Sequence, residues 1–280
     1  MATASSSHST PEHAQTEIAS PYAGSLILNA DDWGRDVETT DRIFECVTAG
    51  TVSSASAMVF MEDSERAAGL AREKSVDCGL HLNFTLPFSV RDCPSRLKEQ
   101  QGRVLRYLRG HRLAQVFYHP GLASSFKYLV EAQIQEFTRI FGGPPRRIDG
   151  HHHMHLCANV LFGGLLPEGT IVRRNFSFSP KEKRRINRLY RSAIDRVLAR
   201  RHSLTDYFYS LPPLEPASRI DEIFSMARQF VVEVETHPVN PAEYKFLTSG
   251  EILRRAGDLP IARAYTDPTA ARAVVAAENR

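Results

Sequence analysis

Histidines fill four of the five positions 151–155 in the stretch DGHHHMHLC, residues 149–157, of a chain with eleven histidines among 280 residues. Imidazole nitrogens bind divalent metals and exchange protons near neutral pH, so such a cluster indicates metal or acid–base chemistry. It lies in the middle of the chain, whereas expression tags sit at the termini. We therefore interpret these histidines as part of a site that the fold itself builds.

Three other predicted strands also end in groups that could do chemistry. Asp31 and Asp32 follow LILNA, His81 follows VDCGL, and His237 follows VVEVET. Taken singly, the acids could cap a turn, His81 could be a hydrogen-bonded core histidine, and His237 could belong to a turn. Functional groups of parallel α/β sheets, however, gather beyond the carboxyl ends of the strands. Together these residues predict one site, and two histidines with one carboxylate form a common divalent-metal set.

Two backbone geometries are open for the histidine cluster. An extended backbone would send His151, His153 and His155 to one face and His152 to the other. A helical backbone would place His151 and His155 on one face, four residues apart. Because both geometries include His151, this residue is the first candidate for a metal ligand.

The elements that must position these groups alternate from residue 25 onward, which is typical of a parallel α/β sheet. Strands are expected over residues 25–32, 51–59, 76–84, 146–153, 170–176 and 230–238. Helices are expected over residues 37–50, 63–74, 126–142, 221–229 and about 250–257. A long insertion at about 85–121 interrupts this rhythm, and such excursions often form the rim or lid of a site. The pattern predicts a barrel-like single domain.

Composition limits the classes of protein further. Residues 1–22 are rich in Ser, Thr, Ala and Pro, which predicts a disordered tail ahead of a domain over 23–280. The amino terminus lacks the basic and apolar regions of a secretory signal, and no apolar run is long enough for a transmembrane helix. The four cysteines have irregular spacing, which argues against a disulfide framework or a zinc knuckle. We expect a cytoplasmic protein.

Charge is concentrated in one segment. Residues 173–201 hold eleven Lys and Arg against Glu182 and Asp195, and the segment from about 180 to 201 is predicted to be helical. A basic helix could meet nucleic acid, anionic lipid or an acidic substrate, or could simply be a solvated face with its arginines paired elsewhere. No known nucleic-acid module accompanies this segment, so we expect no nucleic-acid partner.

Five motifs, in this order, carry a family resemblance: LILNADDWG, TVSSASAM, CGLHLNFT, RRIDGHHHMHL and VEVETHP. They resemble the YdjC-like carbohydrate deacetylases, a family that includes chitooligosaccharide deacetylases and hopanoid-associated members, over residues 25 to about 240. The resemblance implies an α/β fold, a distorted, TIM-barrel-like (β/α) barrel of the polysaccharide-deacetylase type. It also implies a divalent metal, usually magnesium, and removal of an N-acetyl group from an amino sugar or N-acetylated oligosaccharide. Zinc or another transition metal is the alternative.

The family's functional residues carry over by position. Asp32 matches the metal carboxylate, and His81 and His151 match the metal histidines. Asp31 matches the general base, and His237 matches a candidate general acid. Asp149, His153 and His155 are then expected to orient the ligands or contact the substrate.

The sequence departs from the family pattern at three positions, and none of them removes a ligand. Trp33 stands where phenylalanine is usual, Gly150 where serine is common, and Thr236 where cysteine is frequent. The basic segment and the insertion do not match strongly, which leaves the identity of the acetylated substrate open.

Two other functions fit part of the pattern. Two histidines and a carboxylate also form the iron site of mononuclear iron(II) oxygenases, although these enzymes usually carry an H-x-D pair that is absent here. A non-catalytic module that binds metal or anionic glycans is the other alternative. The sequence leaves open a homodimer and a peripheral contact with a lipid-linked substrate.

Overall fold

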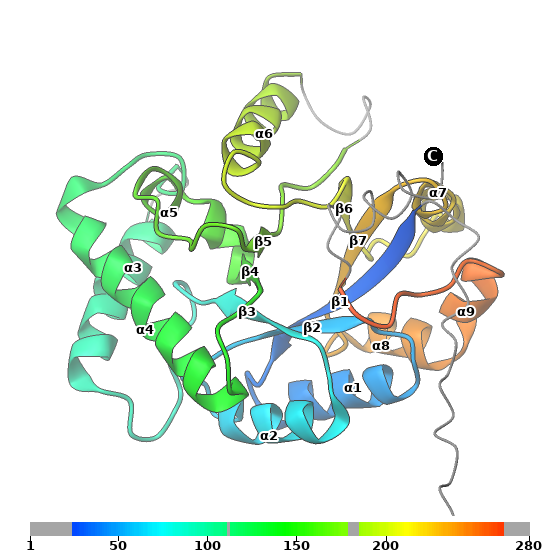
Figure 1. Ribbon diagram of the computed structural model, residues 1–280, viewed down its shortest axis with the longest axis horizontal. Helices are drawn as coiled ribbons and strands as arrows, with labels where there is room; N and C mark the ends of the chain where they lie inside the picture. Colours follow the sequence, from blue (N-terminus) through cyan, green and yellow to red (C-terminus); the bar gives the residue numbers. More distant parts are fainter. Residues whose placement is uncertain (1–23, 111–112, 179–184, 266–280) are drawn as a thin grey trace, which may run out of the picture.

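Residues 24–110, 113–178 and 185–265 are described in the computed structural model of this chain (Figure 1). The predicted tail over residues 1–22 lies outside these ranges. The strands are β1 (Ser25–Trp33), β2 (Ser54–Ala57), β3 (Cys78–Leu82), β4 (Arg147–Gly150), β5 (Ile171–Val172), β6 (Tyr207–Ser210) and β7 (Val231–Thr236). The helices are α1 (Val37–Thr48), α2 (Ser64–Lys74), α3 (Ser95–Gly110), α4 (Ala123–Phe141), α5 (Ala158–Phe162), α6 (Arg185–Leu198), α7 (Ala217–Ala227), α8 (Pro241–Thr248) and α9 (Glu251–Ala256), with 3₁₀ turns η1 (Pro120–Leu122) and η2 (His151–Leu156).

The strands form one 7-stranded sheet in the order β5-β4-β3-β2-β1-β7-β6, and every pairing in it is parallel. The two edges of the sheet approach each other, because Ile171 in β5 bridges to Ser203 and the Ser177 amide donates to the Phe208 carbonyl in β6 at 2.8 Å. The sheet therefore curls into a distorted barrel with helices outside it (Figure 1). The predicted single-domain α/β barrel fold is confirmed.

The outer face of the sheet carries the apolar core. Leu26, Leu28 and Ala30 alternate along β1 and are fully buried with Val232 and Val234 of β7 in one hydrophobic cluster. Helices cover this face and contribute their own apolar stripes, because alternate residues of a strand point to opposite sides of the sheet.

Helix α1 buries only part of its apolar stripe. Ile43 is fully buried, and Phe44 and Val47 are half-buried against the core, but Val37 is 48% exposed. The Asp36 side chain accepts from the Thr39 amide and so caps the start of this helix, which leaves Val37 at the solvent-facing first turn.

The inner face of the sheet is polar. The side chains that point inward include Asn29 and Asp31 from β1, Ser54 and Ser56 from β2, His81 from β3, Arg147 and Asp149 from β4, and Glu233 and Glu235 from β7, all of them buried. A barrel interior with this composition is a site rather than a packing layer.

Several element boundaries differ from the sequence prediction. Strand β4 ends at Gly150, and the histidine run forms η2 instead of continuing the strand. Strand β5 is only two residues long. Two elements, strand β6 and helix α8, were not predicted. Strand β6 has only four residues, YFYS, and lies just before a proline-rich turn. The insertion at 85–121 contains α3, which packs along α4.

Among the helices in the described ranges, none combines the length and the apolar character that crossing a bilayer requires.

Candidate active site

An irregularity in β1 turns both Asp31 and Asp32 toward the inside of the barrel. Consecutive residues of a regular strand would point to opposite faces. Here the β1–β2 register shifts between Ala30 and Trp33, and Asp32 takes a left-handed backbone with φ 72°. As a result the carboxylates of Asp31 and Asp32 lie 3.9 Å and 3.4 Å from His81 Nε2. Non-glycine residues adopt this backbone at a cost of about 1 kcal/mol or more, and such strain is concentrated at functional sites.

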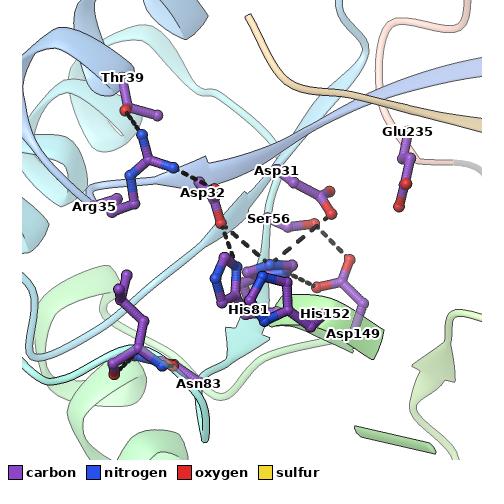
Figure 2. Close-up of polar contacts among 12 residues, drawn as sticks. Asp31, Asp32, Arg35, Thr39, Ser56, His81, Asn83, Asp149, His152 and Glu235 are labelled. Atoms are coloured by element: carbon purple, nitrogen blue, oxygen red, sulfur yellow. Dashed lines mark hydrogen bonds and ion pairs between the residues drawn. The ribbon is translucent and has the colours of Figure 1, made fainter. Parts of the chain in front are cut away.

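Asp32 is at the centre of a cluster of three potential ligands (Figure 2). Its Oδ1 lies 3.0 Å from His151 Nδ1 and faces His81, while its Oδ2 accepts from Arg35 at 2.8 Å. One donor atom from each of Asp32, His81 and His151 lies within 4.8 Å of the others. Burial alone would raise the pKa of Asp32, but hydrogen bonds from His151 and His81 hold it well below the ordinary value.

Asp149 orients the His81 ring by contacting the nitrogen that faces away from Asp31 and Asp32. Its Nδ1 lies 2.7 Å from Asp149 Oδ1, which leaves Nε2 directed at Asp31 and Asp32. Burial alone would lower the pKa of His81, but the carboxylates of Asp31 and Asp149 raise it to about 10. This pairing fixes the ring and leaves Nε2 as the nitrogen available to a metal.

Arg173 holds Asp31 with two hydrogen bonds. Its Nη1 and Nη2 lie 2.7 Å from Asp31 Oδ2 and Oδ1, and the guanidinium also contacts Asp149 at 3.0 Å and Glu233 at 2.7 Å. Both Arg173 and Asp31 are buried. Burial alone would raise the pKa of Asp31, but the Arg173 charge lowers it, so this acid stays ionised.

A second arginine, Arg147, also contacts Asp149. Arg147 Nη1 donates to Ser56 Oγ at 2.9 Å and lies 3.2 Å from Asp149 Oδ2, while the Ser56 hydroxyl donates to the same Oδ2 at 2.5 Å. The side chain passes over Gly79, where an added Cβ would meet Arg147 Cζ at 2.7 Å. The Tyr265 ring lies 4.6 Å from that Cζ, and its hydroxyl donates to Glu233 at 2.7 Å.

Two overlapping clusters offer metal ligands within the described residues, and their surroundings differ. Asp31, His81 and Asp149 form the second one, but Arg173 already neutralises both of its acids. In the cluster of Asp32, His81 and His151, the acid is paired with Arg35 through the oxygen that faces away from the two histidines. Two imidazole nitrogens and one carboxylate oxygen fit a divalent metal with open positions, and this donor set suits zinc, manganese, iron or cobalt as well as magnesium.

The histidine run adopts neither of the predicted geometries. His152 and His153 have left-handed backbones, with φ 54° and 58°, inside η2. The expectation that His152 faces away from His151 is therefore wrong: the two ring centroids are 4.0 Å apart, and His152 Nδ1 lies 3.0 Å from Thr85 Oγ1. Thr85 lies in the turn that Asn83 stabilises by accepting from the Thr85 amide, so the start of the insertion borders the histidine run.

The last two histidines of the run lie on the other side of the cluster. His153 Nε2 is 3.6 Å from Glu235 Oε2, and its ring packs edge-on against Phe176 at 4.6 Å. His155 is fully buried, and its Nε2 lies 2.9 Å from the Arg173 carbonyl. Burial lowers the pKa of His155 to about 4, so this ring is neutral and donates from Nε2.

His237 follows β7 at the same edge of the sheet as Asp31. The register pairs Ala30 of β1 with Thr236 of β7. Asp31 directly follows Ala30, and His237 directly follows Thr236. The His237 amide donates to the buried Glu243 carboxylate at 2.9 Å, and the side chain is half-buried. Within the described residues its imidazole forms no hydrogen bond or ion pair with the acid–histidine cluster.

The sequence prediction missed the arginine that the acids share and the two glutamates opposite it. Arg173 lies in the basic segment and was counted with its charges, although it also lies within the strand predicted over residues 170–176 and directly follows the observed strand β5. Glu233 and Glu235 alternate within VVEVET, which places them on one face of β7. That alternation is the signal in the sequence that could have identified both glutamates as inward-facing. Burial raises the pKa of Glu235 well above its ordinary value, and Asp31 adds to the shift.

Comparison with known proteins assigns this chain to a family. A family model described as YdjC-like protein matches residues 25–261. A chitooligosaccharide deacetylase of Proteus mirabilis is 34% identical over 136 residues, which are 48% of this chain and 51% of the relative. A carbohydrate deacetylase of Mus musculus is 35% identical over 138 residues, 48% of this chain and 44% of the relative. The match thus spans about half the length of these curated relatives.

Solved structures share the fold. A putative cellobiose-phosphate cleavage protein of Enterococcus faecalis V583 aligns with a TM-score of 0.61 at 21% identity, covering 86% of this chain and 97% of that one.

Proposed function

Because this chain belongs to the YdjC-like protein family, we propose that it is a metal-dependent hydrolase that removes an N-acetyl group from an amino sugar or N-acetylated oligosaccharide. The observation that carries the proposal is the pairing of a ligand cluster with a separate acid. Asp32, His81 and His151 converge on one side, and Asp31 stands beside them with both oxygens held by Arg173. The names of the curated relatives support the same chemistry.

In this proposal Asp32, His81 and His151 hold the metal. A divalent cation there would supply Lewis acidity, which polarises an acetyl carbonyl and lowers the pKa of water. His81 is oriented for this role because Asp149 occupies its other nitrogen at 2.7 Å. The family resemblance favours magnesium, while the two nitrogen ligands suit zinc and other transition metals at least as well.

Asp31 is the proposed general base. Arg173 fixes the carboxylate and keeps it ionised, so it can accept a proton from the attacking water. Its Oδ2 lies 3.9 Å from His81 Nε2, so it borders the ligand cluster without being part of it. Arg173 acts through Asp31 and is a positioning residue.

His237 is the proposed general acid for the departing amine. It follows the strand next to Asp31, and its backbone is held by Glu243 while its imidazole is uncommitted among the described residues. A positioned acid at this step contributes roughly 10² to 10⁴ in rate. His153 borders the substrate space beside Glu235, and His155 supports the Arg173 backbone.

The decisive experiment separates the base from the ligands. Acetate release would be measured on a panel of N-acetylated glycans after metal removal and reconstitution with single metals. We expect Asp31→Asn to keep stoichiometric metal and lose turnover by at least about 10², because a general base contributes 10² to 10⁴. His81→Ala and His151→Ala should lose the metal itself, measured by elemental analysis after dialysis.

The matched control is Asp41→Asn. The Asp41 side chain is 52% exposed and forms an ion pair with Arg66 on the surface. This variant should keep both metal and turnover. Full activity of Asp31→Asn would refute the base assignment. Turnover that required oxygen and a 2-oxo acid would instead favour the oxygenase alternative.

A further inference from the structure

Helix α6 exposes an apolar stripe that the proposed hydrolysis does not use. Ile186, Leu189, Tyr190 and Val197 recur at helical spacing on one face and are 80%, 70%, 41% and 39% exposed. A different face of the helix packs on the body of the protein through Ile194 and Leu198, which are buried. A surface helix normally hides its apolar face, so a second, exposed one indicates a binding surface.

Arginines border this stripe on the side away from the body. Arg185, Arg196 and Arg200 are exposed, and over the described ranges no carboxylate lies within ion-pair distance of them. The single acid of α6, Asp195, is buried and binds Arg174 at 2.9 Å, so it does not offset their charge. The surface therefore combines apolar side chains with arginines that form no ion pair among the described residues.

The same helix is tied to the candidate active site. Asp195 also accepts from the backbone amide of Asn175 at 3.0 Å, two residues after Arg173. Arg191 of α6 stacks on Phe178, with 5.1 Å from Cζ to the ring centroid. Phe176 and Phe178 line a pocket of about 550 Å³, and Phe176 contacts His153. In Figure 1, α6 stands at the periphery beyond β5 and β6.

We propose that α6 docks this protein on the surface of an anionic lipid bilayer. Helices with an apolar face and a cationic flank lie in the bilayer interface, where the apolar residues enter the headgroup boundary and the arginines meet anionic lipid. A second copy of the chain is the less favoured occupant, because a two-fold contact would bring the same arginine flanks together. This inference rests on the proposed function: docking through α6 would place the candidate active site beside lipid-linked N-acetylated sugars.

The test is co-sedimentation of the full chain with vesicles of phosphatidylcholine, alone or mixed with phosphatidylglycerol. We expect binding to the mixed vesicles, at least tenfold weaker binding to phosphatidylcholine alone, and release at high salt. The double change Ile186→Ser and Leu189→Ser should lower the partition coefficient more than tenfold, since each buried methylene contributes about fourfold. Arg185→Gln and Arg196→Gln should each lower it about fivefold.

Matched controls are Val37→Ser and Leu253→Ser, which are exposed to 48% and 47% elsewhere on the surface, and Arg103→Gln for charge. These should bind like the parent. Vesicle binding needs no turnover, and acetate release from a soluble glycan should be unchanged in the stripe variants, so failure here is distinct from failure of the proposed function. Equal binding by the stripe variants would overturn the proposal. A dimer in solution that Ile186→Ser and Leu189→Ser convert to monomer, without vesicle binding, would also overturn it.

Discussion

The two faces of one curled sheet have opposite chemistry. Outside, Leu26 and Leu28 of β1 pack against apolar helices. Inside, Asn29 and Asp31 of the same strand join a network of acids around Arg173. The outer face is stabilised by burial of apolar area, which tolerates variation in side-chain shape. The inner face depends on each charge having its partner, so loss of one group leaves others unpaired in a buried space.

The largest effect should come from removing the shared cation on the inner face. Arg173→Met leaves Asp31, Asp149 and Glu233 without their common partner. We expect the free energy of unfolding to fall by about 3–5 kcal/mol, the usual result of breaking a buried ion pair. Urea denaturation measures it. Arg201→Met, which removes an exposed pair with Glu168, should change stability by less than about 0.5 kcal/mol. Equal effects of the two variants would contradict the contrast.

A change of comparable size on the outer face should leave the chemistry intact. Leu28→Ala creates a cavity in the apolar core and should cost about 3 kcal/mol of unfolding free energy. Turnover per folded molecule should be unchanged, because the substituted side chain points away from the site. Measuring acetate release alongside denaturation checks this. If the folded variant lost turnover, the two faces would not be independent.

A smaller effect should appear as pH dependence of stability. Burial lowers the pKa of His155 to about 4 in the folded protein, against about 6.5 in the unfolded chain. The stability that comes from keeping His155 neutral is therefore fully present above pH 6.5 and is lost as the pH falls toward 4. This loss lowers the free energy of unfolding by about 2 kcal/mol between pH 7 and pH 5. His155→Gln cannot titrate and can still donate to the Arg173 carbonyl. Denaturation at both pH values should show a smaller loss for the variant, and an identical loss would exclude this histidine as the source.

The positions of the candidate site residues along the strands could be predicted from sequence alone. Asp31, His81, Asp149 and His237 lie in or just after β1, β3, β4 and β7, and parallel pairing brings these strand ends to one edge. That part depends only on local pattern and on the direction of the strands. The roles assigned to these residues stay proposals.

What the sequence could not reveal depends on tertiary contacts. The left-handed backbones of Asp32, His152 and His153 are unfavourable locally and persist only because surrounding contacts hold them. Arg173 resembles its solvent-facing neighbours in sequence, and only the fold distinguishes a buried arginine with several acidic partners from an exposed one. Local propensity carries no signal for either feature.

The place of β1 in the sheet has a consequence for the order of folding. This first strand lies between β2 and β7, with Leu26 paired to Val232 near the other end of the chain, and Asp31 meets Arg173 across 142 positions. At synthesis rates of about 5–20 residues per second, one edge of β1 waits roughly ten seconds or more for its neighbour. Such non-local pairing slows folding and exposes an apolar strand edge in the meantime. We therefore expect the newly made chain to be more prone to aggregation before β7 emerges than after it.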